Sequence, residues 1–197
     1  FPYFFIIYWR DKMNAKIDLS QTYLKTKRLI LRPWQEDDVE DFYEYARVEG
    51  VGEMAGWLHH QNIEESQMIL KMFIEERKTL AIVYQENNKV IGSIGLEYCR
   101  DDLDSSFDNL KGREIGYVLN KDYWGKGIMS EAVACVIDYC FKELQFDFLC
   151  CGYFLENSRS KRVNEKMGFT FYKNVIHRTR YGVDKKTVLN VLYNNSE

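Results

Sequence analysis

The chain has 197 residues, a length that suits one domain. Hydrophobic residues make up 46% and charged residues 29%, which is the composition of an ordinary globular protein. The formal net charge of −3 provides no overall positive field, so the composition argues against a nucleic-acid-binding protein.

Residues 1–12 contain the apolar run FPYFFIIYW. This run is too short to cross a bilayer and lacks a basic leader and a small-residue cleavage site. We therefore expect no signal peptide, no membrane partner and a cytoplasmic protein. Because Met13 follows directly, we expect residues 1–12 to be a non-native extension and residues 13–197 to form a single domain. An additional edge strand or a homodimer contact is the alternative for the extension.

The hydrophobic pattern predicts strands and helices along the rest of the chain. Residues 27–34 alternate apolar and polar as a half-buried strand does, and the helix over 63–77 places Leu70, Phe73 and Ile74 on one face. The order β-α-α-β-β-β-α-β-α-β-β predicts a mixed α/β fold. The expected strands cover 27–34, 79–85, 89–99, 113–119, 146–155, 169–181 and 186–193, and the expected helices cover 35–48, 63–77, 128–144 and 156–167.

The five cysteines form an odd set without a C-x-x-C pair, and the three histidines show no ligand spacing relative to them. We therefore expect no metal site and interpret the cysteines as small buried hydrophobic residues in a reducing compartment. Adjacent Cys150 and Cys151 would point to opposite faces of their strand.

Gly125 and Gly127 flank Lys126 directly before the predicted helix over 128–144, in the stretch YWGKGIMSEA. A helix N-terminus offers unpaired N–H groups and the positive end of the helix dipole, so it suits a phosphate. The spacing matches neither the P-loop pattern G-x-x-x-x-G-K-[ST] nor the dinucleotide pattern G-x-G-x-x-G. By itself the motif leaves a phosphate site and a plain glycine turn open.

The stretch REIGYVLNKDYWGKGIMSEA, followed by ENSRSKRVNEKMGF, resembles the acetyl-CoA motifs of the GNAT N-acetyltransferase superfamily. More narrowly, the chain resembles the branch that acetylates ribosomal proteins on an N-terminal alanine. KTKRLILRPWQEDDVEDFYEY is similar to the opening of that branch, and KVIGSIGLE is similar to its third strand. The resemblance covers residues 24–193. It implies the GNAT acyl-CoA N-acyltransferase fold, acetyl-CoA as co-substrate, no metal and an amine acceptor.

This resemblance implies a use for the glycine turn. The family pattern Q/R-x-x-G-x-G/A falls on residues 124–129 with Gly127 as its central glycine, although Trp124 and Met129 depart from it. Backbone N–H groups of the turn would bind the pyrophosphate of CoA, while Lys126 would add a charged contact or lie in solvent. The implied cofactor-binding residues are Val118, Leu119, Trp124, Gly125, Lys126, Gly127, Ile128, Met129, Ser130, Asn157 and Ser160.

Acetyl transfer needs a neutral amine and hydrogen-bond donors for the developing oxyanion. A terminal α-amino group has a pKa of about 7.7–8.0 and a lysine about 10.4, so the α-amino group needs only a weak base. The position of Glu114 is similar to that of the catalytic glutamate in several GNAT enzymes, with Glu97 as the alternative base and a cross-strand ion pair as the structural alternative. The resemblance places the oxyanion donor at the backbone N–H of Val118 or Leu119.

Many GNAT enzymes use a tyrosine on the second motif helix to protonate the leaving thiolate, but the matching residue here is Asn164. Asn157 and Ser160 match the N-x-x-S of the branch. We assign Asn157 to the pantetheine arm and Ser160 to the sulfur as a catalytic residue, with a helix N-cap and a surface position as their structural alternatives. A thiol with a pKa of about 8.5 leaves readily, so the missing tyrosine is tolerable.

Three functions stay open on the sequence. The leading one is an acetyl-CoA-dependent N-acetyltransferase that acts on a protein N-terminal amine. The second keeps this chemistry but transfers the acetyl group to a small amine such as a polyamine or an aminoglycoside. The third is a non-catalytic acyl-CoA-binding sensor, which Met129 and Asn164 keep open.

Overall fold

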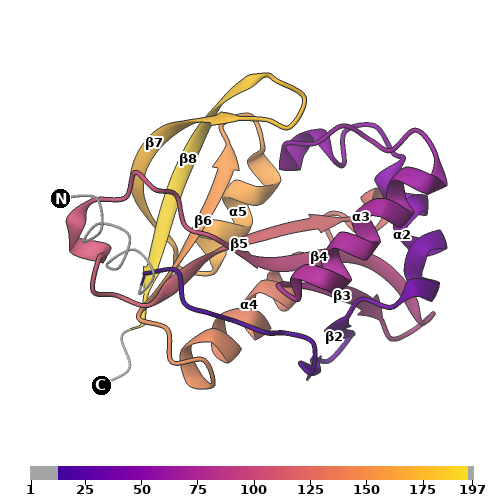
Figure 1. Ribbon diagram of the computed structural model, residues 1–197, viewed down its shortest axis with the longest axis horizontal. Helices are drawn as coiled ribbons and strands as arrows, with labels where there is room; N and C mark the ends of the chain where they lie inside the picture. Colours follow the sequence, from indigo (N-terminus) through magenta and orange to yellow (C-terminus); the bar gives the residue numbers. More distant parts are fainter. Residues whose placement is uncertain (1–12, 195–197) are drawn as a thin grey trace.

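The computed structural model describes residues 13–194, and the predictions made for residues 1–12 lie outside this part. It contains one eight-stranded mixed sheet with helices packed on both faces (Figure 1). Over this part of the chain, each helix is too short or too polar to cross a membrane.

The order of the predicted elements is confirmed. The structure adds only the two-residue strand β1 and short 3-10 turns, of which η2 (Glu53–Ala55) matters most below. The strands are β1 (Leu24–Lys25), β2 (Leu29–Pro33), β3 (Thr79–Tyr84), β4 (Lys89–Glu97), β5 (Gly112–Leu119), β6 (Phe148–Phe154), β7 (Thr170–Arg178) and β8 (Asp184–Tyr193). The helices are α2 (Val39–Ala46), α3 (Ile63–Glu76), α4 (Ile128–Lys142) and α5 (Ser158–Lys166).

The sheet order is β1-β2-β3-β4-β5-β6-β8-β7, with β8 inserted between β6 and β7. All neighbouring strands are antiparallel except β5 and β6, which are parallel. Their parallel pairing extends only from Gly112↔Phe148 to Glu114↔Cys150. Beyond Glu114 the two strands no longer pair within the described residues, so the sheet opens at its centre.

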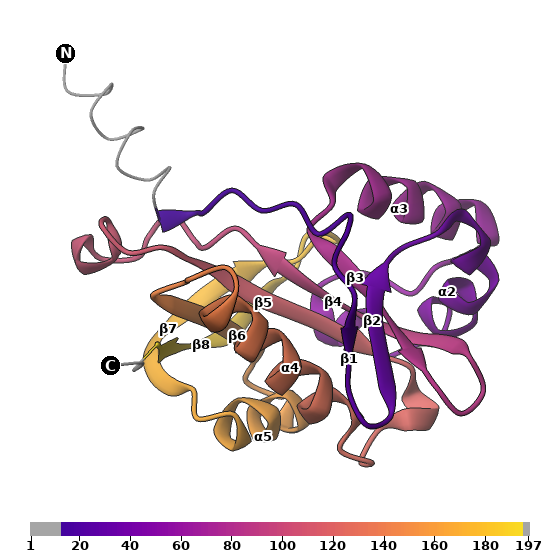
Figure 2. The same ribbon diagram turned by 90° about the horizontal axis from the view of Figure 1, so that it is seen from below.

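Helices α4 and α5 cover one face of the sheet, and α2 and α3 cover the other (Figure 2). A cluster of hydrophobic side chains packs beneath each pair of helices. Ile115 and Leu119 of β5 pack under α4, whereas Val118 packs on the side of α2 and α3. This is the alternation expected of a strand with both faces covered. Cys151 joins the α4 cluster and Cys150 a third cluster, which confirms that the adjacent cysteines point to opposite faces.

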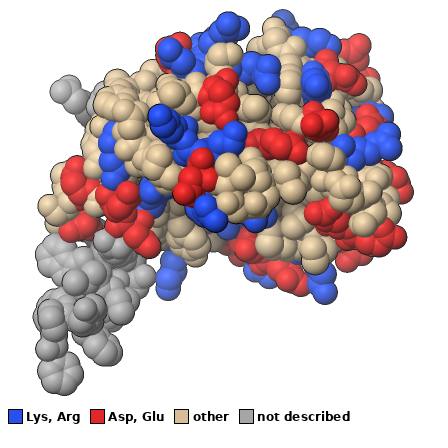
Figure 3. Space-filling view, turned by 90° about the horizontal axis from the view of Figure 1, so that it is seen from above, with Lys and Arg blue, Asp and Glu red and all other residues tan. Residues whose placement is uncertain are grey.

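The five cysteines are free thiols, and all but the half-buried Cys135 are buried. Within residues 13–194 no group of three or more potential metal ligands lies together. Lysine, arginine and acidic side chains alternate over the face shown in Figure 3, without a large field of one sign.

Candidate active site

The glycine turn before α4 combines two unusual backbone conformations with open space. Gly125 and Gly127 have φ angles of 73° and 71°, in the left-handed region that other residues rarely adopt. A Cβ added to Gly125 would meet no atom within 4 Å, and one added to Gly127 would meet only the Arg28 guanidinium at 3.8 Å. The glycines are therefore needed for the turn itself, and they also leave its backbone accessible.

Helix α4 begins directly after this turn and presents free donors there. Its first backbone hydrogen bond runs from the Glu131 N–H to the Gly127 carbonyl, at 3.1 Å. The N–H groups of Ile128, Met129 and Ser130 therefore lack intrahelical acceptors at the positive end of the helix dipole. All three residues line a cavity, so this end of the helix suits an anion.

An arginine directly before β2, Arg28, holds the turn in place. The Arg28 Nε donates to Glu131 Oε2 at 2.7 Å, and its Nη1 donates to the Lys126 carbonyl at 3.0 Å. The Thr26 hydroxyl donates to the other oxygen of Glu131 at 2.6 Å. Burial acts to raise the pKa of Glu131, but these hydrogen bonds outweigh it and hold the pKa below its usual value. Sequence reasoning missed Arg28, because about a hundred residues separate it from the turn.

A cavity of about 280 Å³ lies between the glycine turn, the end of β5, the start of α5 and η2. Of the predicted cofactor residues, only Lys126 does not line it. The Lys126 ammonium is exposed and lies 5.4 Å from the centre of the Tyr123 ring. The other lining residues are Val51, Met54, Ala55, Tyr117, Tyr123, Arg159, Arg162, Val163 and Lys166.

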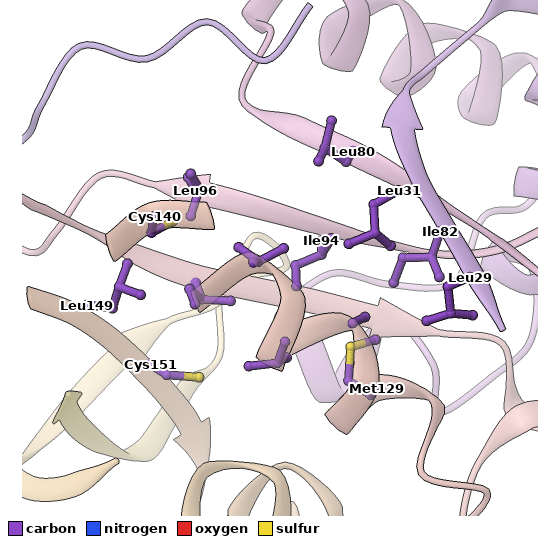
Figure 4. Packing of buried hydrophobic residues seen from close by; sticks show 14 of the residues in the cluster. Leu29, Leu31, Leu80, Ile82, Ile94, Leu96, Met129, Cys140, Leu149 and Cys151 are labelled. Atoms are coloured by element: carbon purple, nitrogen blue, oxygen red, sulfur yellow. The ribbon is translucent and has the colours of Figure 1, made fainter. Parts of the chain in front are cut away.

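The two residues that depart from the family pattern have structural explanations. The Trp124 Nε1 donates to the Leu119 carbonyl at 2.8 Å, which ties the turn to the end of β5, and the Arg159 guanidinium stacks on the indole at 3.8 Å. Met129 is only 7% exposed and packs into the cluster under α4 (Figure 4). Its side chain therefore serves the core while its backbone faces the cavity.

The start of α5 is tied to both neighbouring segments. The Asn157 carboxamide caps the helix by accepting the Ser160 N–H at 3.2 Å, and its Nδ2 donates to the Met54 carbonyl at 3.4 Å. Ser160 is buried rather than a surface residue, and its Oγ lies 2.8 Å from the Tyr117 hydroxyl.

Tyr117 lines the cavity and was not identified as a site residue from the sequence. It comes from β5, yet the Nδ2 of Asn164 on α5 donates to its oxygen at 3.5 Å. The same amide group contacts Cys151 Sγ at 3.3 Å and the Ser160 carbonyl at 3.0 Å. Burial raises the pKa of Tyr117 well above its ordinary value, so the hydroxyl stays protonated. The alternation of β5 could have revealed it, because Tyr117 shares the face of Ile115 and Leu119.

Glu114 lies on the same strand but on the opposite face, outside the cavity. It stands directly across from Glu97 on β4 and Cys150 on β6. Although the residue keeps some exposed surface, protein surrounds its carboxyl group. This burial raises the pKa of Glu114 to about 7, with Arg100 acting against the shift and Glu97 adding to it. Glu97 differs because it forms an ion pair with Lys78 at 2.6 Å.

Residues 28–170, well over half of the chain, match the family model for the acetyltransferase (GNAT) domain. The chain belongs to the GNAT family of acetyltransferases. It is 32% identical over 166 residues to the probable N-acetyltransferase YjcK of Bacillus subtilis, covering 74% of this chain and 82% of YjcK.

Solved GNAT structures share the fold. The ribosomal-protein-S5-alanine acetyltransferase of Vibrio fischeri superimposes with a TM-score of 0.69 at 20% identity, over 89% of this chain and 98% of that one. The microcin C7 self-immunity acetyltransferase MccE, solved in complex with acetyl-CoA and AMP, gives 0.72 at 18% identity, over 90% and 99%. The predicted superfamily, fold class and enzyme class are therefore confirmed.

The MccE neighbour was solved with acetyl-CoA bound. The residues around the cavity fit this ligand in three respects: an open glycine turn, free N–H groups at a helix start, and three cationic side chains on α5. Those cations are Arg159, Arg162 and Lys166.

Proposed function

We propose that this enzyme transfers the acetyl group of acetyl-CoA to the N-terminal α-amine of a peptide or protein, by direct attack on the thioester. The observation that carries the proposal is the opening of the sheet beyond Glu114. At this opening, the alternation of β5 leaves the Glu114 carboxyl group, with its raised pKa, on one face and the Tyr117 hydroxyl, close to that of Ser160, on the other. A base and a pair of hydroxyls would thus flank the strand along which the thioester would lie.

On the donor side, the turn of Gly125 to Gly127 and the N–H groups of residues 128–130 would hold the pyrophosphate. The cations of α5 lie close enough to the cavity to balance the remaining phosphate charge. Asn157 would contact the pantetheine arm while capping α5. Lys126 would then contribute at most a contact at the rim, because its side chain lies outside the cavity.

Glu114 would act as the base, either directly or through a water molecule. A base whose pKa lies near 7 accepts a proton readily at neutral pH, when an α-amine with a pKa of about 7.7–8.0 is already partly neutral. Glu97 is less suited to this role, since its carboxylate is engaged by Lys78. The developing oxyanion would be stabilised by the backbone N–H of Val118 or Leu119, where β5 has left β6.

Ser160 would stabilise the departing thiolate by donating a hydrogen bond to the sulfur, and Tyr117 would support it by donating a hydrogen bond to the Ser160 oxygen. The two hydroxyl oxygens lie 2.8 Å apart, which is hydrogen-bond distance. Asn164, at the helix position where other GNAT enzymes carry a tyrosine, instead supports the Tyr117 hydroxyl with its amide. In this proposal the hydroxyl of Tyr117 on β5 takes the place of the helix tyrosine for which this chain has Asn164.

A terminal amine as acceptor is supported by the name of the Vibrio fischeri neighbour, which acts on an alanine of a ribosomal protein. To test the proposal, the protein is mixed with acetyl-CoA and a panel of N-terminal peptides, spermidine and an aminoglycoside, and free thiol is followed. We expect turnover on peptides. Turnover on small amines alone would refute the acceptor class, and acetyl-CoA binding without any turnover would favour a sensor.

A further inference from the structure

Three glycines form a row across the sheet, on the face opposite α4. Gly95 of β4 and Gly116 of β5 are direct cross-strand partners. Because Glu114 pairs with Cys150 on β6, Gly152, two residues further along β6, is on the same face as Gly116, across the opening between the two strands. We call Gly95, Gly116 and Gly152 the glycine row.

The glycine row is bounded on both sides along the strands. The side chains of Glu97 and Glu114 reach over the row from one side: a Cβ added to Gly95 would lie 3.3 Å from Glu97 Oε1, and one added to Gly152 would lie 3.2 Å from Glu114 Oε1. On the other side are Val118 and Phe154, two residues along from Gly116 and Gly152, and the segment around η2 lies against them.

Two hydrogen bonds hold the η2 segment in place. The Asn157 Nδ2 donates to the Met54 carbonyl at 3.4 Å, and the Arg180 N–H of the β7–β8 loop donates to the Gly56 carbonyl at 2.9 Å. Figure 1 shows this loop reaching over to η2. One side of the glycine row is thus a fixed hydrophobic boundary, and the other carries carboxyl groups.

The two ends of the row differ. At the β8 end, Leu189 pairs with Gly152 and is buried. At the β3 end, Thr79 pairs with Gly95, and its hydroxyl is buried without a hydrogen-bond partner among the described residues. A Cβ on Gly95 would lie 2.9 Å from this oxygen, so the hydroxyl points over the row. A buried hydroxyl without a partner is costly, which makes Thr79 a group that a ligand would satisfy.

Packing within the protein does not require Gly116. A Cβ added there would find its nearest neighbour, Glu97 Cγ, at 3.7 Å, an ordinary contact distance. Its φ angle is not in the left-handed region either. Gly116 follows the base candidate Glu114 by two residues on the same face of β5, so the function proposed above would bring the attacking amine to this position.

We propose that the glycine row and Thr79 together form the acceptor subsite, with the terminal amine over Gly116 and the peptide running over Gly95 to the Thr79 hydroxyl. This rests on the function proposed above. Strands lie about 4.8 Å apart, so Thr79 is roughly 10 Å from Gly116, the span of about three extended residues. The hydroxyl would therefore bond the peptide group that follows the third residue. Glu97, whose side chain is 44% exposed, has room to swing outward as the peptide enters.

The test measures peptide binding by calorimetry in the presence of CoA, alongside turnover with acetyl-CoA. The probes are alanine amide and trialanine amide. Gly116→Ala should weaken binding of both probes roughly tenfold or more, because the methyl group occupies the amine position. Thr79→Val should weaken binding of trialanine amide roughly fivefold, the effect of one hydrogen bond, and leave alanine amide unchanged. Affinity for CoA should stay the same in both variants.

Thr22→Val is the matched control. Thr22 is also a buried threonine, but its hydroxyl lies 3.2 Å from the Tyr139 hydroxyl on α4, away from the glycine row. This variant should lose stability without changing the affinity for either probe. If Gly116→Ala and Thr79→Val bind both peptides as the wild type does, the subsite is refuted even when turnover persists. If the variants weaken peptide binding but no amine is acetylated, the subsite stands and the proposed function fails.

Discussion

The cavity at the end of β5 and the glycine row beside it are built in different ways. The cavity is lined mainly by residues of two short stretches of the chain, Val118 to Ser130 and Asn157 to Lys166. The glycine row, together with Thr79, collects single residues from β3, β4, β5 and β6, and depends on missing side chains. A site built from neighbouring residues of the chain leaves a motif in the sequence, whereas a site built by the pairing of distant strands does not.

The largest expected effect is on turnover alone, without a change in the binding of CoA or of the peptide. Glu114→Gln should lower the turnover of an N-terminal peptide by about a hundredfold at pH 8, within the usual range for removing a general base. The rise in rate through pH about 7 that marks its ionisation should vanish in the variant. Affinities for CoA and for the peptide should change little. A variant that keeps the full rate and the same pH profile would contradict the assignment.

The same substitution makes a prediction for stability. The pKa of Glu114 is raised by burial from 4.5 to about 7 in the folded protein, so the folded state holds this proton more tightly than the unfolded state does. The stability that this proton on Glu114 contributes is complete below pH 4.5 and is lost as the pH rises through 7. Glu114→Gln should therefore gain stability relative to the wild type between pH 5 and 8 in urea unfolding. If the difference in unfolding free energy between the variant and the wild type does not change with pH across this range, Glu114 has an ordinary pKa in the folded protein.

The next effect concerns the glycine turn and is measured as the affinity for acetyl-CoA. Gly127→Ala should weaken acetyl-CoA binding roughly tenfold or more, because a Cβ would occupy the accessible face of the turn. Gly50→Ala is its control, since Gly50 is also left-handed, with φ of 87°, and has open space around it. Both variants should lose similar stability from backbone strain. Equal acetyl-CoA affinities in the two variants would show that only the backbone strain matters.

A smaller effect is expected from the two hydroxyls proposed to stabilise the leaving thiolate. Tyr117→Phe and Ser160→Ala should each lower the maximal rate by roughly tenfold, and the double variant should do little worse, because the hydroxyls act as one chain. Tyr139→Phe removes a hydroxyl from α4 that contacts Thr22 and serves as the control. The maximal rate of this control variant should equal that of the wild type at every pH. Additive losses in the double variant would contradict a shared path.

The smallest effect concerns the support of the turn. Arg28→Ala removes the contacts to Glu131 and to the Lys126 carbonyl, and should weaken acetyl-CoA binding a few-fold, by roughly the effect of one or two hydrogen bonds. Lys89→Ala breaks an exposed ion pair with Glu44 and should leave binding unchanged. Equal acetyl-CoA affinities in the two variants would mean that the turn holds its shape without Arg28.

Most of the fold could be predicted because it follows from local patterns. The helix over 63–77 and the strand of β6 were visible as periodic or continuous hydrophobic runs. The sequence also pointed to Gly125 and Gly127, although it did not indicate their left-handed φ angles. The place of β8 between β6 and β7 was not foreseen, since strand order depends on long-range pairing.

The site was less predictable wherever it joins distant segments. Tyr117 was read as one residue of a strand, and only the packing of α5 against β5 brings its hydroxyl to Ser160 and Asn164. Lys126 carries the most conspicuous charge of the motif, yet its side chain points away from the cavity. Charge and spacing alone do not give the direction of a side chain.

By itself the sequence determined the order of the elements, the family resemblance and the turn that starts α4, because each of these is carried by residues close together in the chain. The tertiary structure alone decided the register of β3, β4, β5 and β6 and the separation of β5 from β6. Register pairs residues that are tens of positions apart, and it places Thr79, the glycines and Glu114 on one face. Long-range hydrogen bonds between strands fix that arrangement, and no local pattern encodes them.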